Sequence, residues 1–372
     1  MAREIDRRHF IGVVGATGSI ALMGVLQDDD EDDEPEEDEF EDPDAEEGGQ
    51  ILVWDAGGTG GTYFPLSGEF KTIVEGETPH GLQVQSTGAS VENVGSLARE
   101  DADFALIQND INFFAYEGTG LEEFEGNPIE NLRGVASLYP ETIHVLTEEG
   151  AGYESIADLE GATINTGDLG SGTQVNALQI LETAGVTDFD EQNADFATAA
   201  DQLRDGDIDA AFIVGGWPVG AVEELATTAD IDVVAIGDDL REELLDEVEF
   251  FAEDEIPGGT YDGVDEDVET VSVQAMITTH EAVDEDIVEE VTAAIFDNAD
   301  DVTIKAEFID LDSALDGMSI PLHPGAEAYF DAQGVELDDE MDDDEEMDDE
   351  EMDDEEMDDE EMDDEEMDDE DE

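Results

Sequence analysis

The sequence feature that most constrains the fold is a repeated unit: a short apolar run, a turn rich in Gly, Ser or Thr, and then a helix-like segment. The apolar runs are Ile51–Trp54, Leu82–Ser86, Phe104–Ile107, Ala162–Thr166 and Ile208–Val214. Short apolar runs bounded by turns are typical of strands, and their alternation with helices is typical of an α/β fold. Because ligands of open α/β sheets bind outside the carboxyl ends of the strands, these turns together predict a shared cleft.

The first of these turns lies in Trp54–Tyr63, which reads Trp-Asp-Ala-Gly-Gly-Thr-Gly-Gly-Thr-Tyr. No Gly-Lys-Ser/Thr follows it, as a nucleotide-hydrolysing phosphate loop requires, and Tyr63 stands where a dinucleotide fingerprint needs its third glycine. A turn that opens a helix exposes unpaired N–H groups and the positive end of the helix dipole, so it suits a small carboxylate. The alternative is a tight strand-to-helix connection without a ligand.

Two similar turns follow in the first half of the chain. They are Ser86–Ser90, with Asn93 one helical turn further on, and Gln108–Asp110. Ser90 is expected to cap a helix over Val91–Arg99.

The second half of the chain contains two more turns of this kind. Gly167–Gln174 leads into a helix, and Ser171 and Thr173 offer hydroxyls beside free backbone donors. This combination suits a carboxylate, and a capped helix after a flexible turn is the alternative. In the later turn Gly215–Pro218, Trp217 either walls a ligand pocket or fills the core of its lobe.

We predict an α/β chain with two lobes. The first lobe takes residues 50–140 and 270–337, and the second takes residues 141–269. A strand over Val271–Ile277 is expected to carry the chain back into the first lobe. Helical segments at Asp284–Asn298 and Ile304–Leu315 would then complete that lobe.

The crossing between the lobes is predicted near Pro140. Two separate strands, Leu132–Leu138 and Ile143–Thr147, are expected on either side of it, because proline has no N–H to donate to a ladder. Tyr139 and Glu141 either face the cleft or only brace the crossing.

Charge is the second constraint, because the 372 residues hold 112 Asp and Glu against nine Lys and Arg. Residues 28–47 contain 16 acidic residues and residues 338–372 contain 29, but residues 48–337 still carry 65 against six basic ones. So acidic a domain repels itself unless concentrated salt screens its charges. We therefore predict a halophilic protein; the alternative, a surface made for a basic partner, usually gives a patch. Nucleic-acid binding is not expected, since there is no basic footprint.

Residues 1–26 resemble an export signal of the twin-arginine type, with Arg7-Arg8-His9-Phe10 before the uncharged run Ile11–Leu26. Leu22–Val25 has the shape of a lipoprotein cleavage box, but Val25 stands in place of the cysteine that would be acylated. Uncleaved anchoring and plain secretion both stay open. Residues 27–49 are predicted to be an acidic linker that holds the folded part away from the membrane.

The C-terminal residues 338–372 repeat Met-Asp-Asp-Glu-Glu, which matches neither a helix face nor a strand face. We predict a disordered acidic tail. No metal site and no cofactor are expected, because nothing in such a tail fixes a coordination geometry.

An enzyme is not expected. The chain has no cysteine, which excludes thiolate nucleophiles and disulfides, and its five histidines lie beside no recognisable serine or carboxylate motif.

Taken together, the turns resemble the TAXI family of solute receptors for TRAP transporters, of haloarchaeal type. The resemblance covers about Ile51 to Gly334, in family order, and Ala89 replaces a glycine that is usual in the second motif. The matching motifs are Gly57–Tyr63, Ser86–Ser90 with Asn93, Gln108–Asp110, Leu138–Glu141, Gly170–Thr173, Gly216–Pro218 and Pro321–Ala326.

The resemblance implies a two-lobed fold of the periplasmic binding protein type II kind, with a hinge between the lobes. Such a receptor lies outside the cytoplasm and closes on one small organic anion, such as glutamate, glutamine, a dicarboxylate or a 2-oxoacid. It delivers this anion to an ion-coupled TRAP permease in the membrane. A monomer is expected. A ligand sensor that reports to a membrane signalling protein without transport is the alternative. The residues expected to contact the ligand are Gly58, Thr59, Gly60, Gly61, Thr62, Tyr63, Ser86, Thr87, Ser90, Asn93, Gln108, Asp110, Gly170, Ser171, Gly172, Thr173, Gln174, Trp217 and Pro218.

The residues add a mechanism for holding the anion. None of the six basic residues between positions 48 and 337 falls in a Gly/Ser/Thr turn. We therefore expect helix N-termini and hydroxyls, rather than an arginine fork, to hold the carboxylate. Arg133 is the one candidate for such a fork, because it opens a strand near the crossing.

Overall fold

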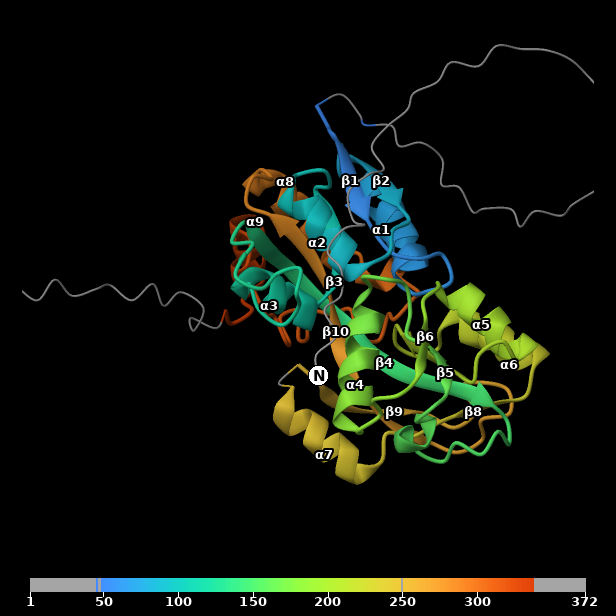
Figure 1. The fold of residues 1–372 in the computed structure, drawn as a ribbon. Helices are drawn as coiled ribbons and strands as arrows, with labels where there is room; N and C mark the ends of the chain where they lie inside the picture. Colours follow the sequence, from blue (N-terminus) through green and yellow to red (C-terminus); the bar gives the residue numbers. More distant parts are fainter. Residues whose placement is uncertain (1–44, 46–47, 249, 338–372) are drawn as a thin grey trace, which may run out of the picture. The chain divides into compact units, whose positions relative to one another are not determined.

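The computed structural model describes residue 45 and residues 48–248 and 250–337 (Figure 1). The chain divides into two units, Met1–Glu39 and Phe40–Glu372, and every described residue belongs to the second. The predicted export signal, the acidic tail and nearly all of the predicted linker lie outside the described residues. None of the helices in the described residues is long and apolar enough to cross a membrane.

Within the described residues, ten strands form one continuous mixed sheet. Its order is β2-β1-β3-β10-β4-β7-β5-β6, with β8 beside β4 and β9 beside β10. The strands are β1 Ile51–Asp55, β2 Gly81–Gln85, β3 Phe104–Gln108, β4 Leu132–Glu148, β5 Thr163–Asn165, β6 Asp190–Gln192, β7 Ala210–Val214, β8 Ile231–Val233, β9 Ala252–Ile256 and β10 Val268–His280. Strands β1, β2 and β3 are parallel, as are β5, β6 and β7, whereas β4 and β10 run antiparallel to their neighbours.

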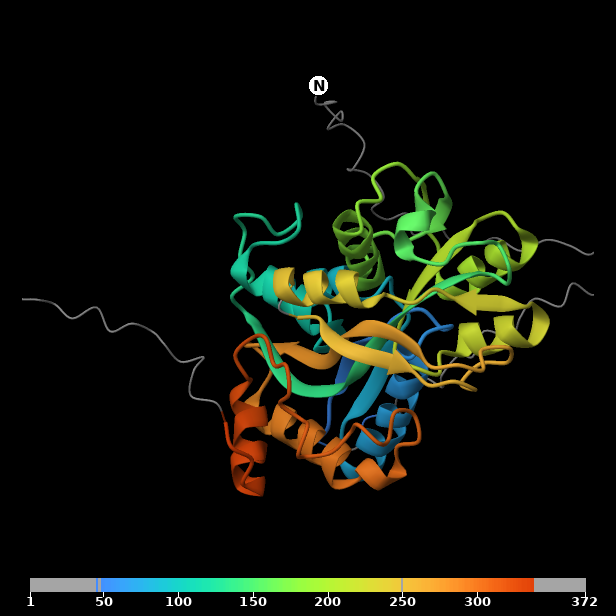
Figure 2. The same cartoon turned by 90° about the horizontal axis from the view of Figure 1, so that it is seen from below.

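The helices cover both faces of the sheet in each lobe. Helices α1, α8 and α9 pack on one face of the first lobe, and α2 and α3 on the other (Figure 2). Helices α4 and α7 cover one face of the second lobe, and α5 and α6 the other. The bounds are α1 Tyr63–Glu77, α2 Ser90–Ala98, α3 Asn109–Glu117, α4 Gly172–Thr183, α5 Phe196–Asp205, α6 Gly220–Thr228, α7 Asp238–Glu247, α8 Glu285–Asp297 and α9 Pro324–Gln333, with 3-10 turns at Ile156–Leu159 and Ala299–Asp301.

The central strands are apolar on both faces because both faces are covered. In β3, Phe104 and Leu106 enter the cluster under α1, α8 and α9, and Ala105 and Ile107 enter the cluster under α2 and α3. Successive side chains of a strand point to opposite faces, so a continuous apolar run is what a doubly covered strand requires. The same alternation in β7 joins the two clusters of the second lobe.

Strands β4 and β10 run side by side from the first lobe to the crossing (Figure 1), and their pairing ends at Thr142 and Ser272. The prediction that Pro140 separates two strands is wrong, because β4 is continuous over 17 residues. Pro140 lies opposite Gln274, next to a register shift between Gln274 and Met276. The irregular ladder at this point tolerates the missing N–H of proline. Beyond the proline, β4 exchanges β10 for β7 as its partner, from Ile143 onward.

The predicted helix over Ile304–Leu315 is also wrong, because this segment forms successive turns. The carboxylate of Glu69 accepts hydrogen bonds from the backbone N–H groups of Thr303 and Ile304. Asp310 accepts from the N–H groups of two residues just after it. Side chains that bond to nearby backbone in this way compete with helix formation.

The prediction that Ser90 caps α2 is wrong by one residue. Ala89 is the N-cap, with φ 67° and ψ −147°, and Ser90 is the first helical residue. The Ser90 hydroxyl instead accepts a 3.2 Å hydrogen bond from the N–H of Gln108. The backbone conformation at Ala89 is nearly exclusive to glycine, which gives a physical reason for the glycine that the TAXI motif carries there.

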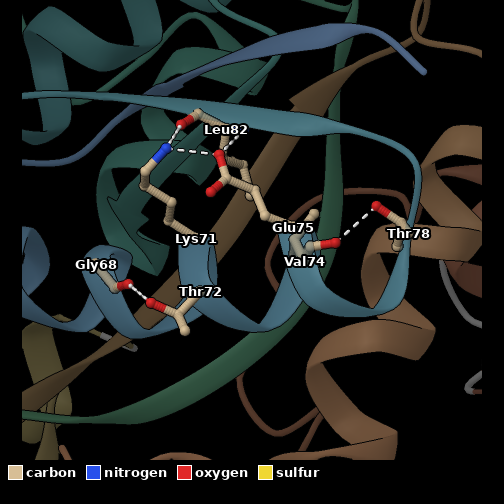
Figure 3. Close-up of polar contacts among 7 residues, drawn as sticks. All are labelled: Gly68, Lys71, Thr72, Val74, Glu75, Thr78 and Leu82. Carbon is tan, nitrogen blue, oxygen red and sulfur yellow. Dashed lines mark hydrogen bonds and ion pairs between the residues drawn. The ribbon is translucent and has the colours of Figure 1, made fainter. Parts of the chain in front are cut away.

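Lys71 joins α1 to β2 (Figure 3). Its ammonium donates a 2.5 Å bond to Glu75 and a 2.8 Å bond to the carbonyl oxygen of Leu82, and Glu75 also accepts from the N–H of Leu82. One of the few cations in the folded part therefore serves packing of the first lobe.

Candidate functional site

A cavity lies between the lobes, where the strand-to-helix turns of both lobes meet. Its volume is about 50 Å³, whereas one buried water needs roughly 10–15 Å³ on the same scale, so it admits a small solute. The lining residues are Gly57, Gly58, Gly60, Gly61, Thr62, Tyr63, Gly88, Ala89, Ser90, Gln108, Tyr139, Glu141, Asp168, Ser171, Gly172, Thr173, Asp195, Phe196, Val214 and Gly215.

The N-terminal ends of five helices reach this cavity. Four of these helices reach it with their first residue: Tyr63 of α1, Ser90 of α2, Gly172 of α4 and Phe196 of α5. The fifth, α3, reaches it with its N-cap residue, Gln108. Helix N-termini carry unpaired N–H groups and a partial positive charge.

Helix α4 shows how such donors are left open. The Ser171 hydroxyl caps the helix by accepting from the N–H of Gln174, at 3.1 Å. The N–H groups of Gly172 and Thr173 meet no acceptor within the described part of the chain. These two amides can therefore serve an anionic ligand group.

Glu141 is a buried carboxyl group in the cavity wall, with 3% of the residue exposed. Its Oε1 accepts the hydroxyl hydrogen of Tyr63, and its Oε2 accepts a 3.3 Å bond from the amide of Gln108. Burial raises the pKa of Glu141 to about 8, and the bonds from Tyr63 and Gln108 only partly oppose this.

Two further carboxyl groups, Asp168 and Asp195, line the second-lobe side. Asp195 caps α5 by accepting from the N–H and hydroxyl of Thr198. Partial burial raises the pKa of Asp168, and the neighbouring Asp195 and Glu92 add to this rise. Among the described residues that line the cavity, none is Lys, Arg or His.

The basic residues of the folded part are engaged elsewhere. Arg133, the candidate for an arginine fork, donates to the carbonyl oxygens of Glu130 and Leu132 and pairs with Glu281. Lys305 lies beside the ring of Tyr139 in the cavity wall but donates to two backbone carbonyls.

Direct hydrogen bonds join the lobes around the cavity. The Thr62 hydroxyl donates to the Gly215 carbonyl oxygen at 2.6 Å, and the N–H of Ala221 donates to the Gly60 carbonyl oxygen at 3.3 Å. Behind the cavity, Asn176 of α4 donates a 2.8 Å bond to Asp110 of α3. The lobes are therefore in contact, as in the closed form of a two-lobed protein.

The sequence model of the NMT1-like family matches residues 55–334. The chain belongs to the NMT1-like family.

Several solved structures are similar to this NMT1-like chain at low sequence identity. MatC from Rhodopseudomonas palustris, solved with bound malate, is 13% identical with a TM-score of 0.51, over 77% of this chain and 99% of MatC. A TctC solute binding protein from Polaromonas is 16% identical with a TM-score of 0.41, over 77% of this chain and 94% of that one. An ancestral arginine-binding protein bound to arginine is 12% identical with a TM-score of 0.44, over 69% of this chain and 96% of the arginine-binding protein. The predicted fold, a two-lobed α/β fold of the type II periplasmic binding protein kind, is confirmed.

The cavity of this NMT1-like protein brings together ten of the residues expected to contact a ligand. They come from turns that are far apart in the chain, and they are Gly58, Gly60, Gly61, Thr62, Tyr63, Ser90, Gln108, Ser171, Gly172 and Thr173.

The other nine are not among the lining residues: Thr59, Ser86, Thr87, Asn93, Asp110, Gly170, Gln174, Trp217 and Pro218. Several of these brace the turns instead. Asn93 donates to the carbonyl oxygens of Ala56 and Leu106, and the hydroxyls of Ser86 and Thr87 donate to those of Gly57 and Ala56. The Trp217 and Pro218 carbonyls receive Lys305.

Sequence reasoning did not select ten of the lining residues: Gly57, Gly88, Ala89, Tyr139, Glu141, Asp168, Asp195, Phe196, Val214 and Gly215. Tyr139 and Glu141 had two open roles, and the structure places both in the cavity wall. A signal for Asp168 was present, because it belongs to the same turn as Ser171. Asp195 and Phe196 had no such signal, since their segment reads as an ordinary helix start.

Proposed function

We propose that this NMT1-like chain is an extracytoplasmic solute receptor of the TAXI type, which binds one small organic anion between its lobes and delivers it to an ion-coupled TRAP permease. The observation that carries the proposal is the cavity, where five helix N-termini converge without a basic side chain among the described lining residues. Backbone N–H groups at helix starts bind carboxylates without a counter-charge. The malate-bound MatC structure, of the same fold, supports a small organic anion as ligand.

The proposed receptor works by closing on its ligand, without a chemical step. A ligand that bonds to both lobes stabilises the shut form, which the permease then recognises. We propose that two lobes move relative to each other: the first comprises residues 50–140 and 270–337, and the second comprises residues 141–269. Export by the twin-arginine route and a position at the outer face of the cell membrane are part of the same proposal.

The first test is native mass spectrometry of the full chain purified in concentrated salt, which should detect a bound small acid. Titration calorimetry of the ligand-free protein then measures its affinity. Thr173→Val should weaken binding by about tenfold or more, because a hydroxyl beside the open α4 amides is lost. Thr72→Val, on the exposed side of α1, is the matched control and should bind normally.

Two results would contradict the binding mechanism. One is a loss of binding in Arg133→Ala while Thr173→Val binds normally, since an arginine would then hold the anion. The other is the absence of any small acid that binds. Vesicles that contain the TRAP permease test delivery: uptake that requires the receptor supports transport, whereas binding without uptake favours the sensor.

A further inference from the structure

A second contact between the lobes lies behind the cavity, where α3 of the first lobe meets α4 of the second. The side chains of Asp110 on α3 and Asn176 on α4 are both 0% exposed, and Nδ2 of Asn176 donates a 2.8 Å hydrogen bond to Oδ2 of Asp110. Oδ1 of Asn176 has no hydrogen-bond partner within the described residues. The side chain of Asn176 is therefore held by a residue of the other lobe.

Asp110 is a buried carboxyl group with no cationic partner among the described residues. It is the second residue of α3, where the helix dipole favours a negative charge. Its Oδ1 accepts a 2.8 Å bond from the N–H of Ile111. Burial raises the pKa of Asp110 to about 6, and the bond from Asn176 is the largest of the contacts that oppose this rise. Loss of that donor in the closed form would leave a buried carboxylate short of a partner, which is costly.

The same face of α4 carries a second contact with α3. Gly172 lies one helical turn before Asn176, so both residues face the first lobe. Gly172 packs closely against the side chain of Gln108, the N-cap of α3. Because Gly172 and Thr173 carry the open amides of the cavity, the Asp110–Asn176 bond fixes where these donors lie relative to the first lobe.

Apolar side chains surround this bond. Val175 of α4 enters the apolar cluster of the first lobe under α2 and α3. Further along α3, the ring centres of Phe113 and Phe114 lie 4.9 Å and 6.0 Å from that of Phe250, which follows α7 in the second lobe. Apolar surface that leaves water when the lobes close stabilises the closed form. Helix α3 therefore contacts the second lobe at its start and at its middle.

The face that α4 offers is uncharged in an otherwise acidic chain. Residues 48–337 carry 65 acidic residues, but α4 contains one charged residue, Glu182, in its last turn. Acidic surfaces would repel each other as the lobes approach, and this helix avoids that repulsion. Salt screens a buried hydrogen bond much less than an exposed ion pair. The contact is therefore suited to concentrated salt.

We propose that the Asp110–Asn176 bond is a latch: it forms when the lobes close, aligns the start of α4 over the cavity and lengthens the time for which the ligand is held. Asp110 and Asn176 are positioning residues, since neither lines the cavity. The inference rests on the proposed function, because it assigns the residues that hold the two lobes shut. It replaces the ligand contact that the family resemblance implies for Asp110.

The separation of the lobes tests the latch directly. The chain has no cysteine, so Glu117→Cys on α3 and Glu182→Cys on α4, both exposed, can carry a pair of spin labels. Pulsed electron spin resonance then measures the distance between the labels in the full chain in concentrated salt, with no added solute and with excess L-glutamate. We expect Asn176→Asp to shift the distances to longer values, because two carboxyl groups then face each other. Unchanged distances in both conditions would refute the latch.

An exchange of the two side chains tests the bond itself. Asp110→Asn combined with Asn176→Asp again places one amide opposite one carboxylate, so this double variant should return to the wild-type distances. Asn112→Asp is the matched control, because Asn112 is also 0% exposed on α3 but donates to Thr278 within the first lobe. It should lower the Tm and leave the distances unchanged. A packing defect at position 176 would persist in the double variant, and that result would contradict the inference.

Ligand affinity gives a second readout. L-glutamate, 2-oxoglutarate and succinate are the probes, and each is titrated by calorimetry into the wild type, Asn176→Asp and the double variant. We expect Asn176→Asp to weaken every probe that binds by the same factor, roughly 10- to 100-fold, for the loss of one charge-assisted bond. The double variant should recover most of this loss. Unequal factors would mean that Asp110 or Asn176 contacts the ligand, against the inference.

The outcomes separate the latch from the proposed function. If Asn176→Asp lengthens the distances and the double variant restores them while no small acid binds, the latch between the lobes stands and the receptor function fails. If a small acid binds to the wild type while the distances ignore the substitution, the receptor function stands and the latch is wrong.

Discussion

Lys305 donates a 2.6 Å hydrogen bond to the carbonyl oxygen of Trp217 and a 3.2 Å bond to that of Pro218. Lys305 belongs to the turns before α9 in the first lobe, whereas the two carbonyls belong to the turn after β7 in the second. Its ammonium group also lies 5.8 Å from the centre of the Tyr139 ring. Burial lowers its pKa to about 8. This cation therefore joins the lobes beside the cavity without entering it.

Replacing Lys305 with Met should weaken ligand binding by about tenfold, because the closed form loses two charge-assisted bonds. Calorimetry measures the affinity, and differential scanning calorimetry measures the Tm. Lys71→Met is the matched control, because Lys71 serves packing within the first lobe. It should lower the Tm and leave the affinity of the folded protein unchanged. Equal affinities of Lys305→Met and the wild type would refute a role in closure.

The contribution of Glu141 to the free energy of unfolding should fall as the pH rises from about 6 to about 8 in the ligand-free protein, whereas His144, His323 and Lys305, whose pKa values are lowered by burial, contribute in the opposite direction. The folded-state pKa of Glu141 is raised to about 8 from an ordinary value of 4.5, so the folded state holds a proton that the unfolded state has released. Stability from this proton is complete below pH 4.5 and is lost as the pH approaches 8, at about 1.4 kcal/mol per pH unit. Asp110, with a pKa raised to about 6, contributes in the same direction only below that pH.

Glu141→Gln isolates this effect, since its side chain does not titrate. Between pH 6 and pH 8 the free energy of unfolding of the wild type minus that of the variant should fall by up to about 1.4 kcal/mol per pH unit, as measured by chemical denaturation at constant salt. Asp110→Asn should keep the wild-type slope in this window. A slope in Glu141→Gln as steep as that of the wild type would show that another group titrates.

Gly172→Ala should abolish most binding, because a Cβ atom there would lie 1.8 Å from Oε1 of Gln108. Gln108 would have to leave its place beside Glu141, or α4 would have to move away from the first lobe. We expect the affinity to fall by at least about tenfold, for the loss of one charge-assisted bond. Gly76→Ala on α1 meets nothing within 4 Å and should bind normally. Normal binding by Gly172→Ala would mean that the lobes do not approach this closely.

Ala89→Gly should stabilise the protein. The positive φ of Ala89 stores roughly 1–3 kcal/mol of strain, and the greater freedom of glycine in the unfolded chain offsets about 0.5–1 kcal/mol of the gain. A net gain of about 1 kcal/mol corresponds to a rise in Tm of about 2 °C, measurable by scanning calorimetry. A lower Tm would show that the alanine is not strained in this turn.

The folded part should require concentrated salt. Residues 48–337 carry 65 acidic residues against six basic ones, and the screening length grows from about 3 Å at 1 M salt to about 10 Å at 0.1 M. Circular dichroism during dialysis from 3 M to 0.1 M KCl should therefore show loss of secondary structure. Retention of the full signal at 0.1 M would contradict the prediction of halophily.

Local patterns predicted much of the fold and about half of the cavity. The strand before Trp54 and the Gly/Thr turn after it are defined by neighbours in sequence, so both could be read directly. The segment Ile304–Leu315 was misread because Glu69, 234 residues away from Thr303, holds its backbone in a turn. Pro140 was misread because the ladder opposite it is irregular, a property of the partner strand β10.

The chemistry of the cavity could not be predicted, because it depends on contacts between residues that lie far apart in the sequence. Lys305 looks like any surface lysine until the fold places two carbonyls of the other lobe against it. Glu141 follows a proline in an apolar strand, and only its contacts with Tyr63 and Gln108 reveal a buried acceptor. The prediction that Asn93 contacts a ligand failed for the opposite reason. Asn93 lies next to a motif turn, but its amide donates to the backbone carbonyl oxygens of Ala56 and Leu106.

Strands β4 and β10 reach the crossing between the lobes as a hydrogen-bonded pair, with register shifts near Gln274 and Ile277, and beyond it β4 pairs with β7 and β10 with β9. Two strands held in this way resist sliding past one another and yield more readily to bending and twisting, and they do so most easily where the ladder is irregular. A bend between the lobes would therefore depend on this ribbon and not on the residues that line the cavity. The residues of the cavity wall could therefore change during evolution while the ladder at the crossing stayed the same.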